Sequence, residues 1–213
     1  MSNAAFALKT RNSVIFSPHP RATKCVKLLT EMFRTELAKL GFPEDLVLCI
    51  ENATIENSAS LMSGADVTVA TGGMAMVKAA YSSGKPALGV GQGNVQCIVD
   101  DDVDLAEAAE KIITGRSFDN GLICLGEQCV FVPKNKYTVF VEEMKKQGAF
   151  YIDAPEAVDQ LRKGLFPDGA FSRVVVGRNA AGVAEGAGIK DVPADARVLV
   201  VPAAATGSGD VLC

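Results

Sequence analysis

Strand-like and helix-like segments alternate through the first 118 residues, and this alternation restricts the possible folds more than any other feature of the sequence. Between two apolar runs, residues 26–40 place apolar side chains three and four positions apart, which predicts an amphipathic helix ending at Gly41. Because strand–helix–strand crossovers are right-handed, the pattern favours an open parallel sheet with helices on both faces. The predicted strands are short and rich in aliphatic residues: 13–16, 46–50, 67–70, 87–90 and 96–99.

The alternation continues to the end of the chain. Asp104, with Glu107 three residues later, resembles a helix-capping box, and the helix that follows is predicted to close at Gly115. Residues 164–192 are rich in small residues and are predicted to be mostly loop, and residues 203–210 are flexible by composition. The remaining predicted elements are helices at 74–81, 137–147 and 154–165 and strands at 129–132 and 197–201.

Composition excludes several classes of protein. Hydrophobic residues make up 48% of the chain and charged residues 22%, which fits a globular core rather than a disordered chain. The net charge of -4 provides no basic field for nucleic acid. No apolar run reaches the length of a membrane span, and no charged-then-apolar leader opens the chain, so we expect a cytoplasmic protein.

Cysteine usage points to a reduced protein without a metal centre. The six cysteines are scattered, none forms a Cys-x-x-Cys pair, and His19 is the only histidine, so a zinc site has little to build on. Most of these cysteines are therefore expected to be small buried residues. Cys129 begins an apolar run and is interpreted as a core residue.

Cys124 is the exception, because it lies in a glycine-flanked turn just after a predicted helix. The segment from Ser117 to Gln128 reads SFDNGLICLGEQ. A reactive cysteine needs exposure and a stabilised thiolate, and such a turn can provide both. The alternative is a buried structural cysteine, since cysteine is among the most buried residue types. A cysteine hydrolase is a further alternative and would require His19 beside Cys124.

Two glycine-rich turns follow predicted strands. Gly72 and Gly73 separate a strand from a helix, where a close backbone approach and free helix N–H groups suit a phosphate. The segment 89–94 is the second turn, and ligands of open α/β sheets bind beyond the carboxyl ends of strands. The structural alternative is that both glycine segments are ordinary tight connections. His19, set between two prolines, has the alternative of a purely local hydrogen bond.

The sequence resembles the CoA-acylating aldehyde dehydrogenases over its whole length. The likeness is nearest to acetaldehyde and succinate-semialdehyde dehydrogenases and to the aldehyde half of bifunctional aldehyde–alcohol dehydrogenases. It is specific because several motifs occur in the right order. The segments that carry it are LKTRN at 8–12, FSPHPRA at 16–22, ATGGMAMVKAAYSSGKPA at 70–87 and SFDNGLICLGEQ at 117–128.

The resemblance implies an α/β fold of the aldehyde dehydrogenase superfamily and a division of labour along the chain. Residues 1–118 would be the later part of a Rossmann-like NAD(P)-binding domain, and residues 119–213 the first part of the catalytic domain. Cys124 would be the nucleophile that attacks the aldehyde. The cofactor would contact Ser17, Pro18 and His19 on its adenosine ribose side, Gly72 and Gly73 at the pyrophosphate, and Val90 and Gly91 near the nicotinamide.

The second glycine segment lacks the glutamate that activates water in hydrolytic aldehyde dehydrogenases, which it otherwise resembles. A thiol attacks a thioester with less help than water needs, so the acyl group is expected to leave on CoA. A homo-oligomer is expected for the full-length form. On the family plan the chain is an internal segment, and the alternative function is a truncated or split fragment that binds only a nucleotide or a partner.

Overall fold

The structure is a computed structural model that describes residues 2–91, 93–206 and 209–212. The chain divides into two compact units, Met1–Gln92 and Gly93–Cys213. Several residues named above lie outside the described residues: Gln92 of the second glycine segment, Gly207 and Ser208 of the small-residue stretch, and Cys213.

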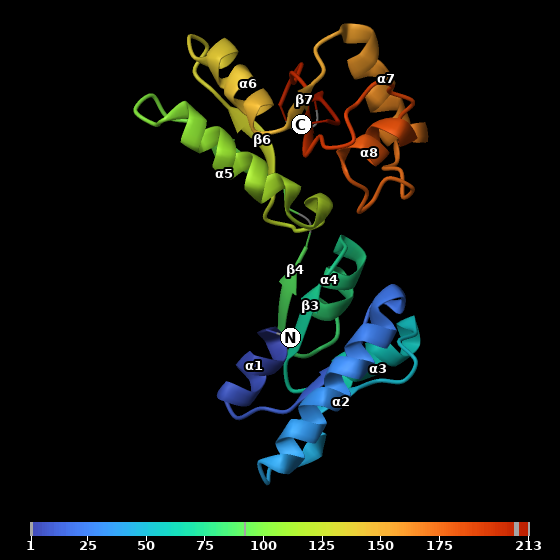
Figure 1. The fold of residues 1–213 in the computed structure, drawn as a ribbon. Coiled ribbons are helices and arrows are strands. Elements are labelled where there is room, and N and C mark those ends of the chain that lie inside the picture. Colours follow the sequence, from blue (N-terminus) through green and yellow to red (C-terminus); the bar gives the residue numbers. More distant parts are fainter. Residues whose placement is uncertain (1, 92, 207–208, 213) are drawn as a thin grey trace. The chain divides into compact units, whose positions relative to one another are not determined.

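The first unit alternates helices and strands, as predicted (Figure 1). Its two pairs of strands are both parallel: β1 pairs with β2 and β3 with β4. No described strand joins one pair to the other by hydrogen bonds. The elements are α1 (Ser2–Lys9), β1 (Val14–Phe16), α2 (Thr23–Lys39), β2 (Val47–Cys49), α3 (Ile55–Gly64), β3 (Thr68–Thr71), α4 (Met74–Tyr81) and β4 (Ala87–Val90), with short 3₁₀ turns at Pro20–Ala22 and Glu44–Leu46.

The second unit repeats this organisation with the parallel pairs β5–β6 and β7–β8. The larger of its two apolar clusters joins α5 and α6 to strands of both pairs, through residues such as Ile113, Phe140 and Val198. None of the described helices is long and apolar enough to cross a membrane. The elements are β5 (Val95–Ile98), α5 (Leu105–Ser117), β6 (Glu127–Phe131), α6 (Tyr137–Lys146), β7 (Ala149–Tyr151), α7 (Pro155–Leu165), α8 (Ala180–Gly186) and β8 (Val198–Val200), with 3₁₀ turns at Phe118–Gly121 and Pro167–Gly169.

The predicted α/β class with parallel strands is confirmed, but the described strands form two-stranded pairs and not one open sheet, and α3 and β7 were not predicted. The helix predicted to close at Gly115 continues to Ser117, and Gly115 lies inside it, where the absence of a Cβ atom leaves room for the Glu127 carboxylate. The region 164–192, predicted to be loop, contains α8, whose helical start is capped by the side chain of Asn179. The segment ending at Asp210, predicted to be flexible, holds that aspartate 96% buried against α7.

The prediction of mostly buried cysteines is wrong for the cysteines that the structure describes. Cys25 and Cys124 are exposed, and Cys49, Cys97 and Cys129 are half-buried. The last three lie on β2, β5 and β6. These strands belong to sheets of only two strands, which leave part of each face uncovered.

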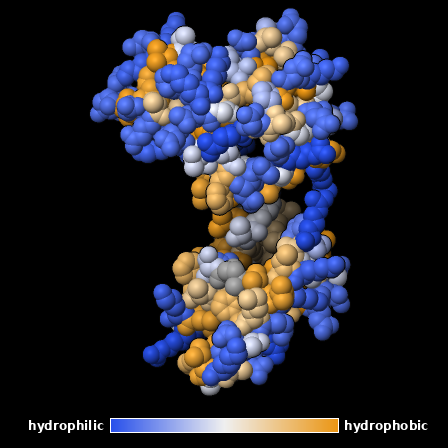
Figure 2. Space-filling view, viewed as in Figure 1, coloured by the Kyte–Doolittle hydropathy of each residue, from blue (hydrophilic) through white to orange (hydrophobic). Residues whose placement is uncertain are grey.

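Large apolar side chains remain on the surface of both units. Figure 2 shows hydrophobic residues gathered over parts of the surface. In the first unit Phe6, Ile55 and Leu88 are each more than half exposed, and in the second Ile98 and Leu125 are too. Contiguous apolar surface on a folded protein marks a place where another polypeptide segment or a partner packs.

A substitution at Gly164 would test how tightly the second unit is packed. A Cβ atom added there would lie 2.6 Å from Ala187 Cβ and closer still to the backbone of Ala187. Alanine favours a helix over glycine by about 1 kcal/mol, but overpacking against backbone costs about 3 kcal/mol. We therefore expect Gly164→Ala to lower the free energy of unfolding by about 2 kcal/mol, measured by urea denaturation.

Gly64→Ala is the matched control for this prediction. Gly64 is also helical, and an added Cβ there meets no atom within 4 Å. That variant should be neutral or slightly more stable than the unchanged chain. A Gly164→Ala chain as stable as the Gly64→Ala chain would contradict the close packing of α7 on Ala187.

Candidate active site

Cys124 lies in a tight turn between the end of α5 and the start of β6. α5 begins at a well-formed cap, in which the Asp104 carboxylate accepts hydrogen bonds from the N–H groups of Ala106 and Glu107 at 2.9 and 3.0 Å. The turn itself closes through a hydrogen bond from the Gly126 N–H to the Ile123 carbonyl at 3.1 Å. The result is an exposed thiol on a short connection that is fixed at both ends.

The chain reaches this turn through an unusual run of left-handed residues. Asp119, Asn120 and Gly121 have φ values of +49°, +52° and +71°. Asparagine, aspartate and glycine tolerate this region better than other residues, although the conformation still costs energy for the first two. The Asp-Asn-Gly sequence is therefore suited to the backbone that leads to Cys124.

Two residues of opposite charge, Arg116 and Glu127, lie near the turn. The Arg116 guanidinium lies against both Gly121 and Gly126, where added Cβ atoms would meet it at 3.3 and 3.7 Å. Burial lowers the pKa of Arg116, and the charge of Glu127 opposes this shift. One carboxylate oxygen of Glu127 is buried without a hydrogen-bond partner among the described residues. The two glycines that flank Cys124 thus make room for a cation beneath the turn.

On its other side the turn meets the beginning of the second unit. A Cβ atom added at Gly93 would lie 3.2 Å from the Cys124 carbonyl oxygen. This distance is tighter than ordinary van der Waals contact. The close approach of the two backbones explains a glycine at this position, which is part of the second glycine segment.

The other described cysteines differ from Cys124 in ways that matter for reactivity. Burial raises the pKa of Cys97, and the charge of Glu127 raises it further. Burial also raises the pKa of Cys49, while Lys27 opposes the shift. A raised pKa holds a thiol in its unreactive protonated form. Cys25 is exposed but lies within the regular helix α2.

Gly72 and Gly73 form the connection from β3 to α4 in the first unit. Neither has a positive φ, so the turn does not need glycine for its backbone conformation. A Cβ atom at Gly73 would meet no described atom within 4 Å, and one at Gly72 would meet only Met76, at 3.8 Å or more. Packing does not require glycine here either, and the space in front of the backbone is open.

The start of α4 is suited to an anion. Gly73 is its N-terminal cap residue and supplies no side chain to cap the first N–H groups. Those groups and the positive end of the helix dipole point out of the helix start. The two glycine turns also adjoin each other, because the Gly72 N–H donates to the Val90 carbonyl at 3.0 Å. They form one edge at the carboxyl ends of β3 and β4.

Within the second glycine turn, packing explains some of the residues. A Cβ atom at Gly89 would clash at 2.8 Å with both Tyr81 and Val77 of α4. At Gly91 it would lie 2.8 Å from the flexible end of Met74. Gly89 is therefore a structural glycine, as the alternative interpretation of this segment predicts. Val90 is about half exposed at the same edge.

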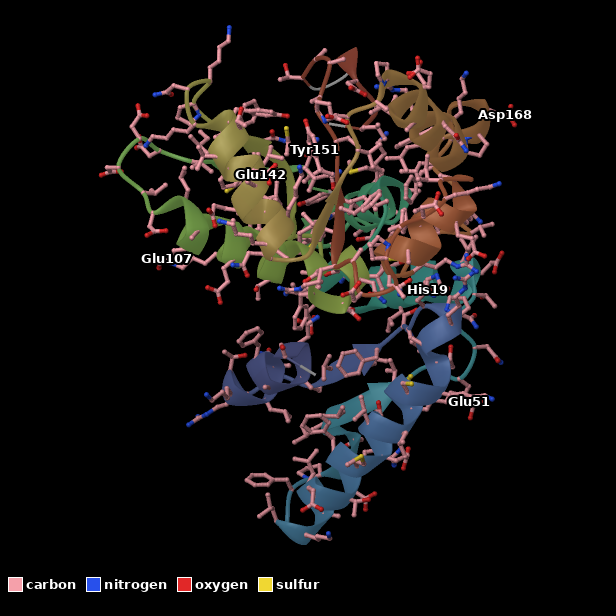
Figure 3. The ribbon with its side chains drawn as sticks, turned by 45° about the horizontal axis from the view of Figure 1, so that its top comes forward. His19, Glu51, Glu107, Glu142, Tyr151 and Asp168 are labelled. Carbon is pink, nitrogen blue, oxygen red and sulfur yellow. The ribbon has the colours of Figure 1, made fainter. Side chains whose placement is uncertain are left out.

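Ser17, Pro18 and His19 connect β1 to the 3₁₀ turn that precedes α2. The Ser17 and Ser58 hydroxyl oxygens are 2.8 Å apart, which ties the loop to α3. Pro18 is buried, whereas His19, labelled in Figure 3, is exposed. His19 Nδ1 accepts a hydrogen bond from the Arg21 N–H at 3.2 Å. This is the local hydrogen bond of the alternative interpretation, and it leaves the other ring nitrogen accessible.

The predicted site residues are divided between the two units. The seven cofactor candidates belong to the first unit, and Cys124 belongs to the second. Sequence reasoning did not single out Arg116, Asn120 or Glu127. The sequence carried a signal for Asn120 alone, the Asp-Asn-Gly run before the cysteine, which is typical of left-handed backbone.

Comparison with known families and proteins gives consistent matches. Residues 1–155 match the aldehyde dehydrogenase family. The chain is 44% identical over 213 residues to the acetylating succinate-semialdehyde dehydrogenase of Clostridium kluyveri, covering all of this chain and 47% of that protein. It is 43% identical over 194 residues to an aldehyde-alcohol dehydrogenase of Clostridium acetobutylicum, covering 91% of this chain and 22% of the relative.

Solved structures agree with these sequence matches. A crystal structure of an acetylating aldehyde dehydrogenase from Geobacillus thermoglucosidasius superposes with a TM-score of 0.93 at 36% identity, covering 99% of this chain and 46% of that one. A propionaldehyde dehydrogenase from Rhodopseudomonas palustris, solved with bound CoA and an acylated cysteine, has a TM-score of 0.83 at 36% identity, covering 89% of this chain and 44% of that one. The chain spans less than half the length of each of these proteins.

Proposed function

The chain belongs to the aldehyde dehydrogenase family, and on this premise we propose that it carries the nucleophile and the nucleotide-binding edge of a CoA-acylating, NAD(P)-dependent enzyme. The overall reaction converts an aldehyde, CoA and NAD(P)⁺ to acyl-CoA and NAD(P)H. The observation that carries the proposal is the exposed Cys124 on a fixed turn, in a chain similar to acetylating and propionaldehyde dehydrogenases. One of those relatives was solved with an acylated cysteine.

Cys124 performs covalent catalysis in this proposal. Its thiolate adds to the aldehyde carbonyl carbon and forms a thiohemiacetal. Loss of hydride from that carbon leaves an acyl-thioester on Cys124. The thiolate of CoA then attacks the thioester, the bond from carbon to the Cys124 sulfur breaks, and the Cys124 thiolate is regenerated. Such a sequence splits one difficult transfer into easier steps.

NAD(P)⁺, when bound, supplies the hydride acceptor. The residues at the carboxyl ends of β3 and β4 fit a dinucleotide, because the open space at Gly73 and the uncapped start of α4 suit a pyrophosphate. We assign three contacts to the cofactor: the adenosine ribose side at Ser17, Pro18 and His19, the pyrophosphate at Gly72 and Gly73, and the nicotinamide near Val90 and Gly91.

CoA rather than water is the proposed acyl acceptor. The segment 89–94 contains no aspartate or glutamate to act as a base toward water. The Glu127 carboxylate is close in sequence to Cys124, but it packs on Gly115 at the end of α5, beside Arg116. It therefore supports the turn in this proposal and does not activate water.

The remaining parts of the proposal concern the whole enzyme. We propose that residues 1–118 belong to the NAD(P)-binding domain and 119–213 to the catalytic domain, although the compact units divide at residue 92. We also propose a cytoplasmic homo-oligomer. The apolar side chains exposed on both units support further packing partners, which are other segments of the enzyme or another subunit.

The first experiment measures NAD(P)H formation with acetaldehyde or succinate semialdehyde, with and without CoA. It uses the chain itself and a chimera in which the chain replaces the matching 213 residues of the Clostridium kluyveri relative. We expect the chimera to reduce the cofactor, and omission of CoA to lower the steady-state rate by at least about tenfold, because water lacks a base. Equal rates of free-acid formation with and without CoA would overturn the CoA assignment.

The exposed apolar surface also favours a second candidate, a fragment that binds a nucleotide or a partner without catalysis. This candidate predicts that the chain alone binds NAD(P)⁺, measured by calorimetry, but reduces none of it. Activity of the chimera together with inactivity of the chain would show that catalysis needs the part of the relative that the chain does not match. Activity of the chain alone would exclude this candidate.

A further inference from the structure

The backbone before Cys124 is held in place by a contact that is distant in sequence. The side-chain amide of Asn120 donates a hydrogen bond to the carbonyl oxygen of Gly177 at 2.9 Å, across 57 positions of the chain. Asn120 is the middle residue of the left-handed run Asp119–Gly121. Two successive non-glycine residues in this region persist only where the surrounding structure holds them. The hydrogen bond to Gly177 is one such restraint.

Gly177, whose carbonyl oxygen accepts this hydrogen bond, has its own conformational requirement for glycine. Gly177 has a φ of +76°, which disfavours any residue with a Cβ atom. A Cβ atom there would also lie 3.3 Å from a methyl carbon of Leu122, which lies between Asn120 and Cys124 in the chain. The Gly177 backbone therefore meets the turn at two points, one polar and one apolar.

The contact also crosses between different parts of the second unit. Gly177 lies two residues before Asn179, which caps α8, and the Val175 carbonyl accepts a hydrogen bond from the Arg178 N–H at 3.1 Å. Val175 is 97% buried. The segment that contains Gly177 is therefore itself packed into the core. Its hydrogen bond to Asn120 holds the cysteine turn in place relative to that core.

We propose that Asn120 is a positioning residue, whose hydrogen bond to Gly177 fixes the left-handed run and so holds the Cys124 thiol exposed toward the aldehyde. The inference rests on the proposed function for its catalytic consequence, but the presentation of the thiol can be measured without it. Asn120 touches neither substrate nor cofactor in this proposal. It acts through the backbone of residues 119–124.

The test separates the hydrogen bond from the backbone conformation. Asn120→Gly keeps the left-handed region accessible and removes the amide, and Asn120→Asp keeps the size and places a carboxylate against a carbonyl. In the chain alone, iodoacetamide labelling followed by peptide mass spectrometry gives the rate at Cys124 relative to exposed Cys25. We expect both variants to lower this ratio by about threefold or more, since a released turn lets the thiol turn inward.

The catalytic consequence is measured in the chimera. We expect kcat to fall about tenfold in both variants, with KM for NAD⁺ and CoA within about twofold, because a misplaced nucleophile loses orientation but not binding. Asn120→Gly should melt at the same temperature as the unchanged chain or higher, since glycine relieves the left-handed strain. If the asparagine were purely structural, Asn120→Gly would instead lower the melting temperature and leave the labelling ratio and kcat unchanged.

Asp119→Asn is the matched control, because it alters the neighbouring left-handed residue and leaves the hydrogen bond of Asn120 to Gly177 in place. Its labelling ratio should equal that of the unchanged chain. If both Asn120 variants also keep that ratio, the positioning role is wrong, whatever the chimera does. If the Asn120 variants lower the ratio but Cys124→Ala leaves the chimera active, the positioning stands and the proposed function fails.

Discussion

Replacing Cys124 with alanine should lower CoA-dependent aldehyde oxidation by the chimera about 10³-fold or more, because removal of a catalytic nucleophile eliminates the covalent pathway. The thiohemiacetal and the acyl-thioester both require this sulfur atom. The loss should appear in kcat, while binding of NAD⁺, measured by calorimetry, stays unchanged. Cofactor binding is retained because the proposed cofactor residues belong to the first unit.

Cys25→Ala is the control for the loss of an exposed thiol. Cys25 and Cys124 are the two described cysteines that are exposed, and Cys25 lies in a regular helix. The chimera with Cys25→Ala should retain its activity. Aldehyde oxidation near the unchanged rate in the Cys124→Ala chimera would disprove the nucleophile assignment. Mass spectrometry of the unchanged chimera, quenched during turnover without CoA, should show the acyl group on the peptide that contains Cys124.

Asp210→Ala should lower the free energy of unfolding of the chain by about 3 kcal/mol at neutral pH, because it removes a buried carboxylate that accepts hydrogen bonds from Arg162 and from two backbone N–H groups and leaves Arg162 with only the exposed Asp159 as a partner. The Arg162 side chain donates to both carboxylate oxygens of Asp210 at 3.2 Å. The backbone N–H groups of Ala204 and Leu212 donate to the same carboxylate at 3.1 Å each. The Asp210 side chain is 1% exposed and that of Arg162 is 29% exposed. Urea denaturation of both chains measures the difference.

The effect of Asp210 should depend on pH in a defined direction. Burial alone would raise the pKa of Asp210, but the hydrogen bonds from Leu212, Ala204 and Arg162 outweigh it and hold the pKa below its usual value. A carboxyl whose pKa is lower in the folded state stabilises that state above its unfolded pKa of about 4. The stabilisation is then lost as the pH falls through the lower folded value.

The difference in stability between the unchanged chain and Asp210→Ala should therefore be constant from about pH 5 to 7 and narrow below about pH 4. Asp195→Ala serves as the control, since Asp195 is exposed in the same unit. That variant should change the free energy of unfolding by less than about 0.5 kcal/mol. A difference for Asp210→Ala that widens toward acid pH would contradict the lowered pKa.

Local patterns predicted most of the elements because those elements depend on local chemistry. The helix at 74–81 and the strand at 87–90 match α4 and β4 at both ends. Asp104 begins α5 because its side chain satisfies N–H groups two and three residues later, a contact within one turn. In contrast, α8 and the continuation of α5 past Gly115 were not predicted. α8 begins at a local cap on Asn179 that the sequence analysis did not use, whereas the glycine inside α5 is explained by its contact with the Glu127 carboxylate.

Glycines show the same division between local and tertiary causes. Gly41 has a positive φ and ends its helix, as the sequence alone indicates. Gly89, Gly115 and Gly164 are glycines because Tyr81, Glu127 and Ala187, respectively, approach their backbones. Gly73 has neither cause, and the open space beside it supports the proposed pyrophosphate contact. Only the three-dimensional contacts distinguish these cases.

The sequence by itself determined the α/β class and the parallel pairing of the strands, because the alternation of strands and helices is a property of the chain. Motif order in the sequence also selected Cys124 as the proposed nucleophile, which stays a prediction. The tertiary structure decided that Arg116 lies beneath the cysteine turn and that Asn120 bonds to Gly177. It also decided that Asp210, in a stretch of small residues, is a buried anchor. These contacts join residues far apart in sequence, and their energies depend on burial and on charges that meet only after folding.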